Sequence, residues 1–165
     1  MDWYPWIVTL HVLGAFLFVF GHGASAFSAL RLRRERDPSR IAAMLEVSTA
    51  SYIAMGIGWV VLLGAGILAT FMAALWGAAW IWVSLVIFVV LTGYMTPRAA
   101  GWTVQVRHAV GVKSPFADKK DDPDPIPASP EELERLLRSP RMFEVTLIGG
   151  IGLATIIALM VLKPF

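Results

Sequence analysis

Three long stretches of the chain, Trp3–Leu30, Val47–Pro97 and Val145–Leu162, contain no Lys, Arg, Asp or Glu. A helix needs about 20 predominantly apolar residues to cross the hydrocarbon core of a bilayer. The middle stretch is much longer than one crossing requires, and small residues near Met72–Gly77 divide it into two. The pattern therefore predicts an all-α fold, a bundle of four transmembrane helices.

Prolines and charged residues mark the ends of the four helices, which we expect at about 4–30, 39–72, 78–96 and 140–162. Asp37 and Pro38 are typical of a helix start, with Asp37 as the N-cap and Pro38 at the first helical position. Pro97 either bends or ends the third helix, because proline lacks the backbone N–H that a helix interior requires.

The segment 98–139 is the one sizeable polar part of the chain. Residues 99–112 are mildly amphipathic, and they either continue the third helix or lie on the membrane surface. Residues 118–130 are rich in Asp and Pro, a composition typical of an extended linker. Ser129 and Glu132 have the spacing of a capping box, which predicts a short helix at 130–138.

The basic residues predict how the bundle is oriented. Of the 14 Lys and Arg residues, five lie in Arg31–Arg40 and eight in Arg98–Arg141, and four alternating helices place both clusters on one side. Positively charged loops stay in the cytoplasm. We therefore expect both termini outside and the segment 98–139 inside, in a single domain of a plasma membrane. Because the chain has no Cys, disulfides and thiolate metal sites are excluded.

Two histidines of the first helix carry the most distinctive chemistry. His11 and His22 are eleven residues apart, so they share one helix face within about 20°. Gly14 lies on that face, and Gly21 and Gly23 flank His22. Small and polar residues favour helix–helix contact, so both imidazoles are expected to point into the bundle. A neutral His there either binds iron or copper, relays a proton, or hydrogen-bonds a neighbouring helix.

A polar pocket at the inner half of the bundle is a second hypothesis, built on Glu46, Tyr52 and Tyr94. Counting residues from the helix ends places Glu46 at the depth of His22, and a His–Glu pair lowers the cost of burying each group. The alternative is that Glu46 lies among the lipid headgroups.

Further ligands are weaker candidates. His108, which follows Arg107, could help His22 hold a haem, although a His in such a position is more often a solvated residue at the membrane surface. Met55, Met72 and Met95 offer thioethers that iron or copper accepts, but Met is more often a lipid-facing or gap-filling residue.

Three segments resemble a bacterial family of four-helix integral membrane proteins, which is distantly similar to copper-resistance D proteins and membrane protoporphyrinogen oxidases. These segments are residues 11–15 (HVLGA), 21–24 (GHGA) and 31–38 (RLRRERDP). The resemblance implies haem b or copper bound through His11, with His22 as a further ligand, in a bacterial inner membrane. The chain departs from a paired-ligand pattern, since the other three expected helices contain no His.

Three functions therefore remain open. The protein is a small redox protein that binds haem or copper, a non-catalytic subunit that assembles with membrane partners, or a homo-oligomeric transporter or proton relay that uses His22 and Glu46. The basic residues of Arg31–Arg36 indicate contact with anionic lipid, and no nucleic-acid partner is expected. Whether the protein is an enzyme stays open.

Overall fold

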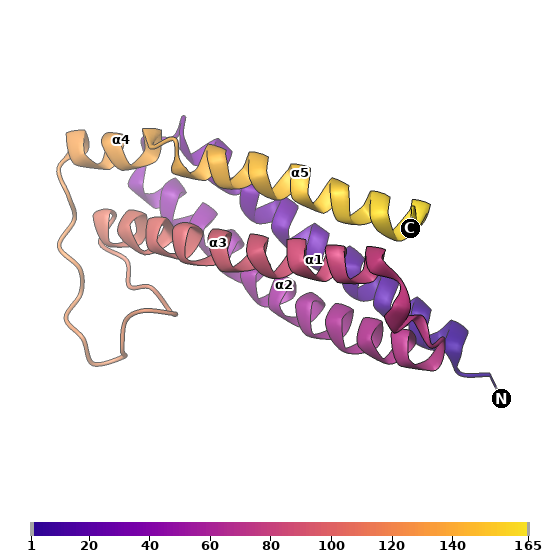
Figure 1. The fold of residues 1–165 in the computed structure, drawn as a ribbon. Helices are drawn as coiled ribbons and strands as arrows, with labels where there is room; N and C mark the ends of the chain where they lie inside the picture. The colour runs from indigo at the N-terminus through magenta and orange to yellow at the C-terminus, as the bar shows by residue number, and fades with distance from the viewer. Residues whose placement is uncertain (1, 165) are drawn as a thin grey trace.

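The computed structural model describes residues 2–164, which form five α-helices and one short 3-10 helix (Figure 1). The elements are α1 (Tyr4–Leu32), α2 (Pro38–Met72), η1 (Leu75–Gly77), α3 (Ala79–Ala109), α4 (Pro130–Arg138) and α5 (Arg141–Leu162). No β-strand occurs within the described residues, and four helical stretches are long and apolar enough to cross a membrane. The prediction of an all-α, four-helix transmembrane fold is confirmed.

The helix starts follow local side-chain chemistry. The carboxylate of Asp37 accepts hydrogen bonds from the backbone N–H groups of Ser39 and Arg40, at 2.9 and 3.4 Å, and Pro38 occupies the first turn of α2. The Ser129 hydroxyl accepts from the backbone N–H of Glu132 at 3.3 Å and starts α4. These caps satisfy N–H groups that have no partner inside the helix.

Helix α3 differs from its predicted length, because it continues through Pro97 as far as Ala109. An interior proline costs about 3 kcal/mol. The residues beyond it include Trp102 and Val106, both fully buried, and such side chains each gain about 1.5–3 kcal/mol from burial. Packing of the distal part of α3 therefore outweighs the local penalty, and residues 99–109 continue the helix.

The four long helices form two pairs. Helix α1 packs along α2 and α3 packs along α5, whereas the backbones of α2 and α3 come close at few points and meet mainly through side chains. Glycines hold the first pair together: a Cβ on Gly58 would lie 2.5 Å from the backbone N of Phe18, and one on Gly14 would lie 2.6 Å from that of Leu62. Only residues without side chains allow two backbones to approach so closely.

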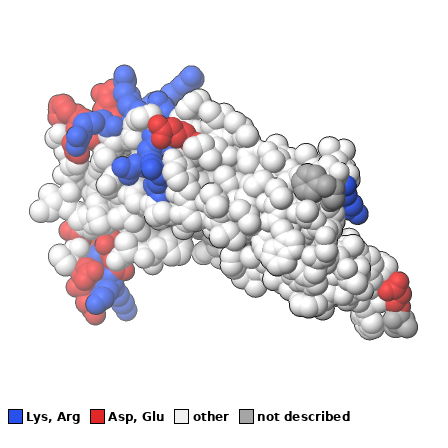
Figure 2. All heavy atoms as spheres, in the orientation of Figure 1, with Lys and Arg blue, Asp and Glu red and all other residues white. Residues whose placement is uncertain are grey.

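At one end of the bundle the helices enclose a hydrophobic core like that of a water-soluble protein, and charged residues surround it. Its buried residues come from α1, α2, α3, α4 and the start of α5: Ala29, Leu32, Ile41, Leu45, Trp102, Val106, Ala109, Leu133, Leu137 and Met142. Figure 2 shows that charges gather at this end, which we call the charged end, and leave the side of the bundle uncharged. Both termini lie at the opposite end (Figure 1).

Candidate functional site

An apolar cavity of about 460 Å³ lies between the two helix pairs. Its walls include Phe18 and His22 of α1, Trp59 of α2, and Phe88 and Arg107 of α3, and α5 also contributes. The cavity is long, because the interval from Phe88 to Arg107 spans about 28 Å at 1.5 Å per residue. The cavity exists because the backbones of α2 and α3 lie apart, whereas α1 packs closely on α2 and α3 on α5.

His22 reaches into this cavity toward α5. A Cβ on Gly149 would lie 2.9 Å from the Nε2 atom of His22, and it would also collide with the terminal methyl of Met95. The missing side chain of Gly149 therefore makes room for an imidazole from α1 and the methyl end of Met95 from α3 at one point of the cavity wall.

His11 has a different environment, although it shares a helix face with His22. Its Nδ1 lies 2.8 Å from the backbone oxygen of Leu62, and because a carbonyl only accepts, Nδ1–H is the donor. A Cβ on Gly66 would lie 2.7 Å from the same ring atom. His11 therefore joins α1 to α2, and it is not among the residues that line the cavity.

The three glycines near the histidines also have separate surroundings. Gly14 and Gly21 lie against the backbone of α2, where a Cβ on Gly21 would be 2.7 Å from the oxygen of Ser51. Gly23 has open space around its Cβ position, with nothing within 4 Å. Gly14 and Gly21 therefore serve helix contact.

Glu46 pairs with Arg107 and not with His22, so the predicted partner is wrong. The Nη1 of Arg107 donates to the Oε1 of Glu46 at 3.0 Å and to the backbone oxygen of Lys113 at 3.1 Å. The side chain of Glu46 is 64% exposed, which agrees with the alternative that placed it near the headgroups. The continuation of α3 past Pro97 brings the guanidinium to this depth, and the His22–Glu46 relay loses its basis.

Arg107 is a candidate site residue that the sequence analysis missed. Its side chain is 2% exposed, and its Nη2 donates to the oxygen of Leu45 at 3.0 Å and to the hydroxyl of Thr49 at 2.6 Å. Its Nε is buried without a partner, and so is the hydroxyl oxygen of Thr146, which lines the same cavity. Buried polar atoms in a native fold are almost always paired, so each such exception requires an explanation.

The predicted polar pocket is only partly assembled. The hydroxyl of Tyr52 lies 3.2 Å from that of Thr103, whose own hydrogen goes to the oxygen of Ala99 at 2.9 Å, and Tyr52 lines the cavity. Tyr94 lies outside this wall, with the guanidinium of Arg98 4.4 Å from its ring centroid. Of Glu46, Tyr52 and Tyr94, only Tyr52 borders the cavity.

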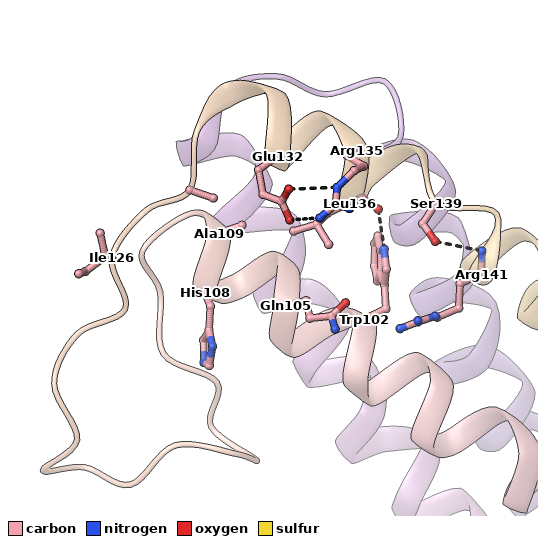
Figure 3. A pocket seen from close by; sticks show the side chains of 11 residues that line it. Trp102, Gln105, His108, Ala109, Ile126, Glu132, Arg135, Leu136, Ser139 and Arg141 are labelled. Carbon is pink, nitrogen blue, oxygen red and sulfur yellow. Dashed lines mark hydrogen bonds and ion pairs between the residues drawn. The ribbon is translucent and has the colours of Figure 1, made fainter.

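A second hollow, of about 570 Å³, lies at the charged end between α3 and α4 (Figure 3). His108 borders it, and its Nε2 lies 2.8 Å from the Oδ2 of Asp118. The same carboxylate accepts the backbone N–H of Ser114 at 2.6 Å. These two contacts, that of Ser114 first, hold the pKa of Asp118 below its usual value. His108 is therefore bound into the loop after α3, and it borders the second hollow and not the cavity.

The four apolar helices and the polar cap at one end define an integral membrane protein. The chain belongs to the family described as "Predicted integral membrane protein (DUF2269)", whose sequence profile matches residues 5–164. Comparisons with the curated proteins and with solved structures gave no match. The similarity to copper-resistance D proteins and protoporphyrinogen oxidases therefore stays a prediction.

Within residues 2–164 no group of three or more His, Cys, Asp or Glu side chains is placed to hold a metal ion. The side chains of His22 and Met95, one from each helix pair, both lie beside Gly149, the first with its Nε2 and the second with its terminal methyl. Chemically, the site offers a long apolar wall, one imidazole, and one buried cation at its charged end.

Proposed function

We propose that the protein binds a long, narrow, apolar ligand inside the membrane, in the cavity between the two helix pairs. The observation that supports this function is the cavity itself. Its volume of about 460 Å³ is within the range of small-molecule sites, and its lining is mostly apolar with a few polar groups, as such sites usually are.

The ligand enters sideways from the bilayer, between α2 and α3. Ile53 and Trp59 of α2 line the cavity and are also 55% and 38% exposed on the outside of the bundle. Thr96 and Ala100 of α3 line the cavity on the opposite side of the same gap, and they are exposed as well. In a membrane, the gap between α2 and α3 faces lipid, so an apolar ligand can enter the cavity without crossing water.

Filling the cavity tests the proposal. Gly56 borders the cavity and has open space at its Cβ position, so Gly56→Leu should fit the helix and occupy ligand space. We expect purified wild-type protein to release a co-purified lipid-like molecule on solvent extraction, measured by mass spectrometry, and the variant to release at least tenfold less.

Gly64→Leu is the matched control, because Gly64 is on the same helix, has equally open space and does not border the cavity. It should retain the ligand. Equal yields from the two variants, or no extractable ligand in wild-type protein, would contradict the proposal.

Haem b or copper bound at His22 is a second candidate function, favoured by an imidazole that faces an apolar cavity, with the side chain of Met95 beside it at Gly149. Imidazole and thioether are a donor pair that both haem iron and copper accept. Such a group would supply electron transfer, and the apolar walls would exclude water from it. His11 remains a predicted ligand only through its Nε2, since its Nδ1–H is already engaged.

Absorption spectroscopy tests this candidate. Protein from haem-replete cells should show a Soret band, or copper by elemental analysis, and His22→Ala should remove the signal. His108→Ala, outside the cavity, should retain it. A colourless, metal-free wild-type protein would exclude this function and leave the binding of apolar ligands unaffected.

A further inference from the structure

The geometry points to a further binding site, in the second hollow between α3 and α4, where the phosphate of an anionic phospholipid binds from the leaflet at the charged end. This site is separate from the cavity between the helix pairs, because no described residue borders both. Three features of the second hollow indicate such a ligand: its unpaired hydrogen-bond donors, its charge balance and its depth in the membrane.

Three side chains that border the second hollow carry hydrogen-bond donors that no described group of the protein accepts. The guanidinium of Arg141 and the amide of Gln105 donate to no group within residues 2–164, and they extend toward one another in Figure 3. The hydroxyl of Ser139 accepts the backbone N–H of Arg141 at 3.3 Å, and its own hydrogen has no acceptor in this part of the chain. Gln105 is exposed and the other two are half-buried, so a ligand reaches all three. A phosphate suits them, because an arginine fork binds phosphate through two parallel hydrogen bonds.

The charges around the second hollow leave one cation without a counter-ion. Arg135 and Glu132 neutralise each other, because the Nε and Nη2 of Arg135 donate to the two carboxylate oxygens of Glu132 at 3.0 and 2.6 Å. His108 is bound to Asp118, whose carboxylate does not border the hollow. Arg141 forms no ion pair within the part of the chain that the structure describes. Its charge therefore favours an anionic ligand over a zwitterionic one.

The second hollow lies at the level of the lipid headgroups. Arg141 is the first residue of α5, and the uncharged stretch Val145–Leu162 begins four residues later. At 1.5 Å per residue, Arg141 is about 6 Å from the start of that apolar stretch. Trp102 also borders the hollow, and Trp is enriched at the membrane–water interface. A phospholipid of the same leaflet therefore already has its phosphate at the depth of this hollow.

An apolar surface continues from the second hollow into the bilayer, where it contacts the acyl chains of the lipid. Ile148 lies seven residues after Arg141, so the two share one face of α5 within about 20°. The side chain of Ile148 is 38% exposed. A lipid whose phosphate binds Arg141 therefore has its chains beside Ile148, and a soluble phosphate ester lacks this second contact.

Native mass spectrometry of the full-length protein, freed of lipid in a non-ionic maltoside detergent, tests this site. The probes are phosphatidylglycerol and phosphatidylethanolamine with the same acyl chains. We expect the first phosphatidylglycerol to bind at least fivefold more tightly than the first phosphatidylethanolamine. Arg141→Gln should reduce this preference to less than twofold. Gln105→Ala, at an exposed position where folding is not at risk, should at least halve it.

Arg138→Gln is the matched control, because Arg138 lies at the same end of the bundle, is exposed and does not border the second hollow. It removes the same charge and should retain the preference for phosphatidylglycerol. Gly56→Leu, which fills the cavity between the helix pairs, should retain it as well. Failure of the proposed function would therefore leave this site unaffected.

Three results would overturn the inference. Equal binding of the two lipids by the wild-type protein would exclude selection for an anion. An equal loss of preference in Arg141→Gln and Arg138→Gln would show diffuse attraction to the charged end in place of a site in the hollow. Binding of glycerol 3-phosphate as tightly as phosphatidylglycerol would assign the hollow to a soluble phosphate ester.

Discussion

The three histidines of this chain show how strongly the contacts of one residue type depend on the residues around it. His11 donates to a backbone carbonyl of α2, His22 faces a cavity beside Gly149, and His108 binds the carboxylate of Asp118. The sequence predicts that His11 and His22 share a face, because helix periodicity is local. The sequence does not reveal which histidine packs against a neighbouring helix and which faces a cavity, because this depends on where the glycines of the other helices lie.

At the residue scale, Asp118 should give the loop after α3 a pH dependence. Its folded pKa lies below the unfolded value of about 3.9, so its stabilising contacts are complete above that value and are lost as the pH falls through the folded pKa. We expect the exchange protection of the Ser114 amide, corrected for intrinsic rate, to be constant near neutral pH and to fall in acid.

Asp118→Asn is the reference for this measurement. It removes the charge that Ser114 and His108 stabilise, so protection of the Ser114 amide should be weaker at neutral pH and should no longer change in acid. Unchanged protection in the variant would show that the carboxylate does not anchor the loop.

At the element scale, local signals predicted helix starts well and the end of α3 poorly. The cap at Asp37 is a contact between residues adjacent in sequence, so composition reveals it. The continuation past Pro97 depends on burying Trp102 against helices far away in the chain. The same error concealed Arg107, because a residue assigned to a surface segment is not expected to be a buried cation or the partner of Glu46.

The contact between α1 and α2 gives a prediction at this scale. Gly58→Ala forces a Cβ against the backbone of Phe18, which cannot yield without moving the helix, so we expect a loss of about 1–3 kcal/mol in unfolding free energy. Thermal or denaturant unfolding in detergent would measure it.

Gly64→Ala is the control on the same helix, because open space surrounds its Cβ position. It should leave stability unchanged or raise it by up to about 1 kcal/mol, since Ala is the better helix former. Equal effects of the two substitutions would argue against close backbone contact in this pair.

At the scale of the whole molecule, the segregation of charge supports a proposed orientation, with the charged end in the cytoplasm of a bacterial cell and both termini outside (Figure 2). The number of helices and their alternation are evident from hydropathy. The cavity is not evident from hydropathy, because it arises from a gap between the backbones of α2 and α3, which are consecutive in sequence.

Single cysteines test this orientation, since the chain has none of its own. Gly77→Cys lies in the turn opposite the charged end, and Ala117→Cys lies in the loop after α3, both at exposed positions. In spheroplasts, a membrane-impermeant maleimide should label the first and spare the second, and permeabilisation should expose both. Labelling of Ala117→Cys and not of Gly77→Cys would show that the protein has the opposite orientation.

The short connection around η1 has one more consequence. The loop 33–37 joins the two members of one pair, and residues 110–140 join the two members of the other, so along the chain only the turn at 73–78 links the pairs. At the charged end the pairs are joined without a covalent link, by the buried core and by the bonds from Arg107 to Leu45, Glu46 and Thr49. The two hairpins are thus fastened at both ends, and any breathing motion that parts α2 from α3 opens the gap between these two attachments.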